Sequence, residues 1–149
     1  MRLKEQIYQA CEQSLQEKID LLQKVLRELH QSATNETKST AGDKHETALA
    51  MLQIEQENKR KQLKELELQQ VTLNKIDPGH VSKEILNGAL VKTDKGYFFI
   101  SIALGKLNVG SVSVYALSAT SPLGVAMRGR IAGGEVQVNG ASYKIFSVE

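Results

Sequence analysis

The chain has 149 residues with 19 basic and 17 acidic side chains, and its formal net charge of +2 excludes a strong general attraction to nucleic acid or anionic lipid. This length accommodates one ordinary domain or two small ones. The single cysteine, Cys11, excludes an internal disulfide framework and fits a reducing compartment. No apolar run approaches the ~20 residues that span a bilayer, and no signal-peptide pattern opens the chain, so we expect a cytoplasmic protein without a membrane partner.

The first half of the chain predicts two long helices. Residues 1–75 contain no proline and one glycine, Gly42, and they consist mostly of good helix formers. Apolar residues recur there every three or four positions, which predicts one apolar stripe on each helix. The first stripe holds Tyr8, Cys11, Leu15, Ile19, Leu22, Leu26 and Leu29, and the second holds Ala48, Met51, Leu52, Leu63, Leu66 and Leu73.

Neither predicted stripe can be buried by its own helix. We therefore expect residues 1–76 to form an antiparallel coiled-coil hairpin, with its loop at 32–41 and its tip region at about 32–47. Cys11 then fills the hairpin core. A coiled coil that dimerises is the alternative, but the polar, glycine-containing break in the middle favours a hairpin, and hence a monomer.

The pattern changes after Asp77-Pro78-Gly79, which ends the helix. Apolar runs at 89–91 and 97–102 flank a turn at 94–96 and predict a β-hairpin. We further predict a strand at 112–117, a short helix at 122–128 with Ser121 as N-cap, and a closing hairpin around Asn139-Gly140. The fold class is thus α+β with two domains, the second at 79–149 being a small antiparallel sheet with one short helix.

A pair of carboxylates lies at the turn between the two predicted helices, in the run Gly42-Asp43-Lys44-His45-Glu46-Thr47-Ala48. Asp43 and Glu46 are spaced as a capping box, with Asp43 at the N-cap and Glu46 three residues later. The same two acids on the tip of a projection are suited to delivering charge into the active site of another protein. Both interpretations stay open on the residues alone. We expect His45 to be an exposed tip residue.

Two motifs make the chain resemble the Gre transcript-cleavage factors of bacterial RNA polymerase. The tip run is similar to the family pattern G-D-x-x-E-N-A, and the run from Ser121 to Arg130 is similar to S-P-x-G-x-A-L-x-G-K. The ending of the chain, at 138–145, is similar to the family's closing glycine hairpin. The resemblance covers nearly the whole chain and implies a coiled-coil hairpin followed by an FKBP-like domain.

The resemblance also implies a function. The hairpin would enter the secondary channel of RNA polymerase, close to the 3′ end of the nascent RNA and within a complex that contains DNA. Asp43 would contact a Mg²⁺ ion held jointly with the polymerase, and Glu46 would orient or deprotonate the attacking water. The chain would have no cofactor of its own and would stimulate the cleavage activity of the polymerase without being an enzyme.

The resemblance assigns further contacts. The turn formed by Ser121, Pro122, Leu123 and Gly124 would bind the rim of the polymerase channel, with Leu123 as an apolar anchor. Lys38 and Lys44 would lie near the RNA backbone, although solvated loop lysines are the plainer interpretation. An FKBP-like fold does not imply prolyl isomerase activity, and the strand-spaced aromatic residues predict no aromatic-lined pocket.

The chain departs from the family pattern at several positions. Thr47 replaces the tip asparagine, Ala50 replaces a common tyrosine, and Gly133-Gly134 replaces Gly-Asp. Two rival functions stay open. One is a transcription modulator or inhibitor that binds the same channel without stimulating cleavage, and the other is a coiled-coil adaptor that binds an unrelated protein.

Overall fold

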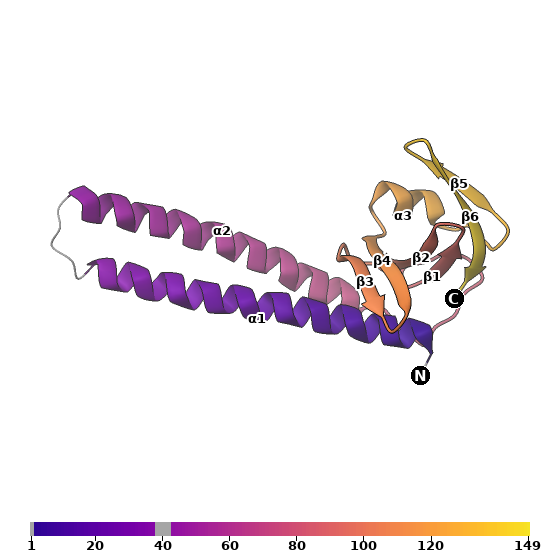
Figure 1. Ribbon diagram of the computed structural model, residues 1–149, viewed down its shortest axis with the longest axis horizontal. Helices are drawn as coiled ribbons and strands as arrows, with labels where there is room; N and C mark the ends of the chain where they lie inside the picture. Colours follow the sequence, from indigo (N-terminus) through magenta and orange to yellow (C-terminus); the bar gives the residue numbers. More distant parts are fainter. Residues whose placement is uncertain (1, 38–42) are drawn as a thin grey trace. The chain divides into compact units, whose positions relative to one another are not determined.

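The computed structural model describes residues 2–37 and 43–149. Two long helices, α1 (Leu3–Thr37) and α2 (Asp43–Asn74), run antiparallel and form the predicted helical hairpin (Figure 1). Helix α1 is longer than expected, since residues 32–37, which we assigned to the loop, are helical. No glycine or proline interrupts this stretch, so the helix continues through it. None of the helices in the described ranges has the length and apolar character needed to cross a membrane.

Packing divides the chain into two compact units. One unit combines residues 1–14 with residues 69–149, and the other is the distal part of the hairpin, residues 15–68. The base of the hairpin thus belongs to the unit that contains the sheet. We predicted a domain boundary at 76–79 that divides the chain into two consecutive parts. The compact units are not consecutive in the chain, so this boundary stays a prediction.

The helices of the hairpin bury one side of α1 more deeply than any side of α2. The buried apolar positions of α1 are Ile7, Cys11, Leu15, Ile19 and Leu22. We placed Tyr8 in the buried stripe, but the buried residue at this level of the helix is Ile7. Tyr8 is only half-buried, and its hydroxyl donates to the Leu73 carbonyl oxygen at 3.0 Å.

The predicted stripe of α2 is confirmed only in part. Leu73 is buried and Leu63 and Leu66 are half-buried, but Met51 is 66% exposed. A polar residue, Gln56, is the buried side chain in the middle of α2. Since no apolar spacing marks Gln56, the sequence pattern missed it.

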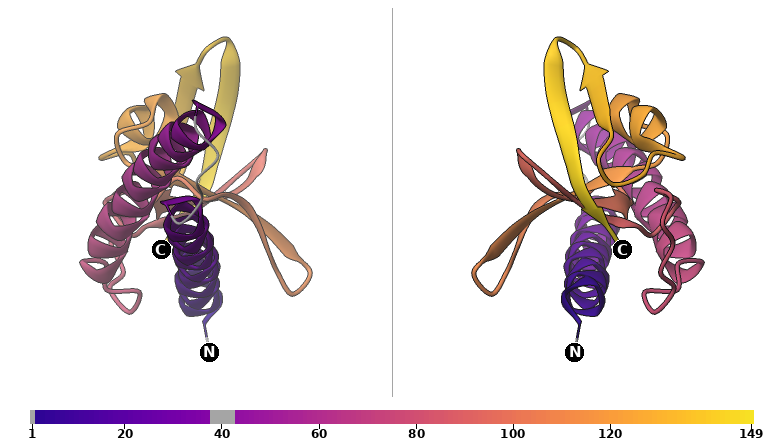
Figure 2. Two further views of the ribbon diagram at one scale, coloured as in Figure 1. Left: turned by 90° about the vertical axis from the view of Figure 1, so that its left-hand side faces the viewer. Right: turned by 90° about the vertical axis from the view of Figure 1, so that its right-hand side faces the viewer.

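The C-terminal part of the chain forms a six-stranded sheet, which confirms the predicted fold class. The strands are ordered β3-β4-β2-β1-β6-β5 across the sheet. Their bounds are β1 (Leu90–Thr93), β2 (Gly96–Ser101), β3 (Gly105–Val109), β4 (Val112–Ser118), β5 (Glu135–Val138) and β6 (Ala141–Val148). The short helix α3 (Pro122–Met127) packs beside β5 (Figure 2).

One detail of the sheet differs from the prediction. Strands β2 and β4 pair in parallel, with Phe98 opposite Tyr115, whereas we expected a purely antiparallel sheet. The cause is β3, a strand that the sequence analysis missed. Because β3 returns the chain and forms an antiparallel hairpin with β4, β4 runs in the same direction as β2 when it pairs with it.

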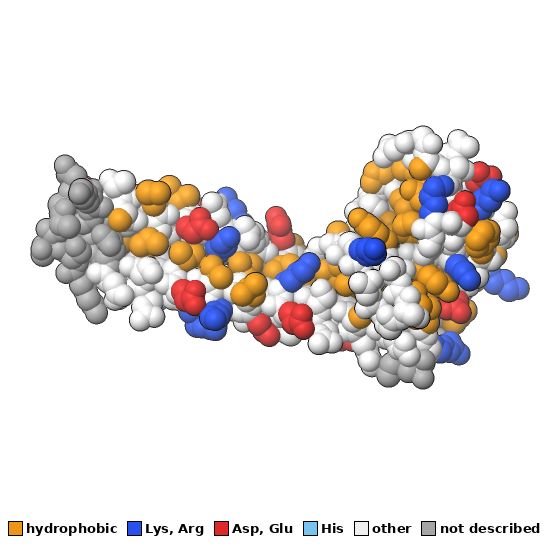
Figure 3. All heavy atoms as spheres, in the orientation of Figure 1, with side chains coloured by type: hydrophobic (Ala, Val, Ile, Leu, Met, Phe, Trp, Pro, Cys, Tyr) orange, Lys and Arg blue, Asp and Glu red, His pale blue; other side chains and the backbone are white. Residues whose placement is uncertain are grey.

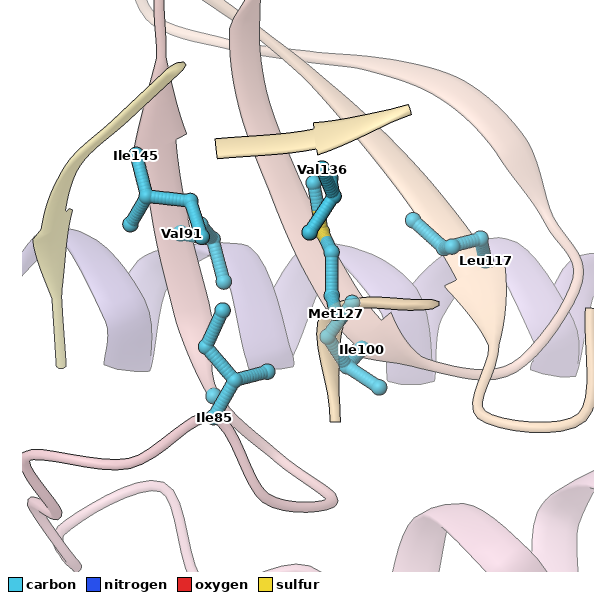
Figure 4. Close-up of a cluster of buried hydrophobic side chains, with 8 residues drawn as sticks. Ile85, Val91, Ile100, Leu117, Met127, Val136 and Ile145 are labelled. Atoms are coloured by element: carbon cyan, nitrogen blue, oxygen red, sulfur yellow. The ribbon is translucent and has the colours of Figure 1, made fainter. Parts of the chain in front are cut away.

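The core of this unit lies between the sheet and α3 (Figure 4). Its side chains come from strands of the sheet, from α3 and from the segment before β1. They are Ile85, Ala89, Val91, Ile100, Leu117, Met127, Val136 and Ile145. The closing hairpin turns at Asn139 and Gly140, whose φ angles of 51° and 80° form the left-handed turn predicted for this pair.

Candidate functional site

The start of α2 carries the predicted acidic site. Asp43 is the first residue of α2, and Glu46 lies one turn later with an exposed side chain. The side chains of Asp43 and Lys44 and the whole of Lys38 lie outside the described residues. The structure therefore gives no separation for the two carboxylates, and both the capping and the catalytic interpretations stay predictions.

The rest of α2 shows how its other charges are used. Glu55 pairs with Lys59 at 3.5 Å, and Glu57 pairs with Lys61 at 3.8 Å. These are i,i+4 pairs on the helix surface, which contribute little to stability. Two of the three basic residues at 59–61 are thus paired with acids on the same helix.

The acidic side chain of Glu46 is one of the ligand types that metal ions bind. Among residues 2–37 and 43–149, the described side chains include no group of three histidine, cysteine or acidic residues able to hold a metal. Glu46 nevertheless offers the carboxylate oxygens that Mg²⁺ prefers. An exposed carboxylate of this kind can add one oxygen ligand to a metal ion that other groups hold.

The start of α3 is a well-defined structural element. Ser121 is the N-cap, as predicted, and its hydroxyl oxygen accepts a hydrogen bond from the Gly124 amide at 3.1 Å. The same hydroxyl donates to the Ser118 carbonyl at 2.6 Å, which joins the helix start to the end of β4. Pro122 follows in the first turn, where a missing amide proton costs nothing.

Gly124 is required at its position for a steric reason. A Cβ atom there would lie 2.3 Å from the Ser118 carbonyl oxygen and 3.0 Å from backbone atoms of Ala119. Both contacts are with main chain, which cannot rotate away as a side chain can. The close approach of α3 to the end of β4 therefore depends on the absence of a side chain.

An apolar groove of about 540 Å³ lies beside the start of α3. Its aromatic wall consists of Phe98, Tyr115 and Tyr143, which come from three different strands. The Phe98 and Tyr143 rings meet edge to face at 5.7 Å, and the Phe98 and Tyr115 ring centroids lie 6.4 Å apart. The remaining lining residues are Lys95, Leu117, Ser121, Pro122, Leu123, Val138, Asn139 and Ala141.

This groove corrects the sequence analysis, which predicted no aromatic-lined pocket. The three aromatic residues are far apart in the chain, so only the strand order could reveal that they meet. Three of the four predicted polymerase-contact residues line the groove, namely Ser121, Pro122 and Leu123. Gly124, the fourth, is buried and is not part of the lining. The Lys95 ammonium lies 4.9 Å from the centre of the Tyr143 ring, at the polar side of the groove.

Two buried titratable groups in the sheet-containing unit lie outside this site. The Lys4 ammonium donates to the His80 carbonyl at 2.6 Å, and burial lowers the pKa of Lys4 against the opposing charges of Glu149 and Asp77. Burial raises the pKa of the Cys11 thiol to about 12, so this thiol is unreactive and acts as a core side chain.

Comparisons with known proteins gave no match in sequence. Neither a protein-family model nor a curated protein sequence matches this chain. Among solved structures, the chain is similar to GreA factor homolog 1 (Gfh1) of Thermus thermophilus, with 15% identity over 92% of this chain and 93% of that chain and a TM-score of 0.37. It is also similar to a second structure of the transcription factor Gfh1, with 16% identity over 93% of each chain and a TM-score of 0.38. At these values the likeness assigns neither a partner nor an activity to this chain.

Proposed function

We propose that this chain is a Gre-like transcription elongation factor that stimulates the cleavage of backtracked transcripts by RNA polymerase. The observation that carries the proposal is the exposed Glu46 in the first turn of α2, within a tip motif that also contains Asp43. An acid at the outer end of a helical hairpin can reach an active site that the chain does not itself contain. The chain's own fold and its two motifs agree with each other on this interpretation.

The proposed chemistry assigns a role to each acid. Asp43 would contribute an oxygen ligand to a Mg²⁺ ion shared with polymerase. Glu46 would orient the attacking water or accept a proton from it. A metal ion bound in this way stabilises negative charge on the phosphate and lowers the pKa of a bound water. The nascent RNA 3′ end would be the substrate.

The apolar groove provides a second contact with polymerase in this proposal. Leu123 is half-buried at the groove, while Tyr115 is 51% exposed and accessible to a partner. Apolar and aromatic side chains of this kind contribute strongly to binding when a partner covers them. The groove would therefore hold the rim of the secondary channel.

The test is a cleavage assay with purified polymerase stalled in a backtracked complex. We expect the protein to shorten the RNA, and we expect Asp43→Asn and Glu46→Gln each to reduce the stimulated rate by at least about tenfold. Glu57→Gln is the matched control, because Glu57 is an exposed acid on the same helix. If all three variants stimulate cleavage at the rate of the unaltered protein, the tip acids are only helix caps.

The same assay also separates the rival functions. Binding to polymerase without any shortening of the RNA would favour the modulator or inhibitor, for which the replacements Thr47 and Ala50 are the motivating departures. Absence of polymerase binding would favour the adaptor. Leu123→Asp and Tyr115→Ser should weaken binding, whereas Val125→Asp, on the exposed side of α3, should not.

A further inference from the structure

A polar layer interrupts the apolar contact between the two helices of the distal hairpin. The Gln56 side chain is only 6% exposed, and its amide nitrogen donates to the Leu29 carbonyl of α1 at 3.1 Å. Its amide oxygen accepts a hydrogen bond from the Arg60 guanidinium at 3.1 Å, one turn farther along α2. Both functional groups of the buried amide are therefore satisfied.

This layer is the outermost buried contact of the described hairpin. Between it and the tip, no described side chain at residues 30–35 or 46–55 is buried. The nearest buried residue of α1 on the other side is Leu22. Among the described side chains, Gln56 is thus the buried one nearest to the end of the hairpin that carries Glu46.

Helix α2 needs such a contact because its apolar residues do not define a single face. Ile54 is 62% exposed and Leu68 is 59% exposed. At about 100° per residue both lie on the side of the helix opposite Leu52 and Leu63, and the exposed Met51 lies about 100–120° from those two residues. Hydrophobic side chains are accordingly visible at the surface along the hairpin (Figure 3). A rotated α2 would bury these side chains in place of Leu52, Leu63 and Leu66, which are only half-buried in the structure.

We propose that Gln56 is a positioning residue that fixes the rotation and register of α2 against α1, and thereby the placement of Glu46. A slip or rotation of α2 would move the Gln56 amide away from the Leu29 carbonyl and break this bond. A buried polar side chain in a coiled coil specifies register in this way, at some cost in stability. The inference rests on the proposed function only for the role of Glu46.

Loss of this contact would displace Glu46 by more than the positional error that catalysis tolerates. Glu46 lies ten residues before Gln56 on the same helix, or about 15 Å along its axis. A slip of one residue shifts every side chain of α2 by about 1.5 Å along the axis and by about 100° around it. A displacement of about 1 Å is enough to reduce a catalytic rate by as much as ~100-fold.

The test replaces the Gln56 amide without changing the length of the side chain. Gln56→Met removes both hydrogen bonds and keeps an unbranched side chain of similar size. Gln53→Met is the matched control, since Gln53 is exposed on the same helix. We expect Gln56→Met to melt at the same temperature as the unaltered protein or higher, because the polar layer is replaced by an apolar one. A clearly lower melting temperature would mean that Gln56 only supports the fold, and would overturn the proposal.

Spin labels measure the register directly. Ser32→Cys and Ala50→Cys place one label on each helix near the tip, at exposed positions. The buried Cys11, with a thiol pKa of about 12, does not react with the label. We expect one narrow distance in the labelled parent and in the Gln53→Met form, and a broad or split distribution in the Gln56→Met form. One narrow, unchanged distance in Gln56→Met would overturn the proposal.

Stimulated cleavage then tests the positioning of Glu46. We expect Gln56→Met to reduce the maximal cleavage rate by about tenfold or more, while the protein concentration that gives half of this rate changes less than about twofold. A changed distance distribution with a full cleavage rate would overturn the positioning role. If the parent protein itself stimulates no cleavage, the proposed function fails, and the label distances alone decide whether Gln56 sets the register.

Discussion

The sheet and the distal hairpin bury their side chains in different ways. In the sheet-containing unit, core residues such as Ile100, Leu117 and Met127 come from β2, β4 and α3, so each is held by several elements. In the distal hairpin, buried side chains such as Leu15, Ile19 and Leu22 come from one stripe on α1 and meet only one other helix. The structure of the sheet is therefore determined by many contacts. The hairpin depends on few, and a single polar layer then decides its register.

Among substitutions that test this comparison, the largest loss of stability is expected at Phe99. Its side chain is fully buried on β2, and Phe99→Ala should lower the free energy of unfolding by about 3–5 kcal/mol. Urea unfolding followed by tyrosine fluorescence measures this change, because three of the four tyrosines lie in the sheet. Phe146→Ala is the control, since Phe146 is 56% exposed, and its cost should stay below about 1 kcal/mol. Equal costs at the two sites would contradict the assigned core.

A smaller effect is expected in the hairpin, where the neighbours Leu21 and Leu22 form a matched pair. Leu22 is buried and Leu21 is 64% exposed. Leu22→Ala should cost about 2–3 kcal/mol, near the lower end of the range for buried leucines. Leu21→Ala should change stability by less than about 0.5 kcal/mol. Helical circular dichroism during thermal unfolding measures both, and a larger loss in Leu21→Ala would show that α1 buries its other face.

Gly124→Ala tests how tightly α3 is held against the end of β4. Alanine normally stabilises a helix by about 1 kcal/mol relative to glycine. Here the added Cβ would lie 2.3 Å from the Ser118 carbonyl oxygen, so we expect a loss of about 1–3 kcal/mol. Gly79→Ala is the control, because its Cβ would meet only the Asp77 carboxylate oxygen at 3.3 Å. A stabilised Gly124→Ala protein would mean that α3 can move away from β4.

The smallest effect is expected at the N-cap of α3. Ser121→Ala removes the acceptor for the Gly124 amide and should cost about 1 kcal/mol. Ser121→Asp should recover part of this loss, because aspartate caps helices well. Ser111→Ala, at an exposed position in the turn between β3 and β4, serves as the control in the same denaturation assay. If Ser121→Ala is as stable as this control, the cap contributes nothing measurable.

The elements that could be predicted from the sequence are those with a strong local signal. Helical spacing and the absence of proline predicted α1 and α2, and the Asn139-Gly140 and Ser121-Pro122 pairs predicted a turn and a helix start that the structure confirms. Strand β3 was missed because its sequence, Gly105–Val109, is short and only half-buried on alternate positions. Its omission also made the predicted direction of β4 relative to β2 wrong.

The parts of the candidate site that sequence reasoning missed depend on contacts between distant residues. The aromatic groove forms only because β2, β4 and β6 bring Phe98, Tyr115 and Tyr143 together. Gln56 is buried because it reaches a main-chain carbonyl of the other helix, which no spacing of apolar residues indicates. The roles of Asp43 and Glu46 come from the family resemblance and stay predictions.

The order of the compact units along the chain has a consequence for engineering. Residues 15–68 are inserted into the sheet-containing unit, and α1 and α2 pass through both junctions without a break. The distal hairpin is thus an inserted segment whose length can be changed by deletions in both helices. Removing one heptad from each arm would shorten it by about 10 Å while keeping the facing of the two helices. Fusion of residue 14 to residue 69 through a short linker would instead give a sheet-containing protein without the projection.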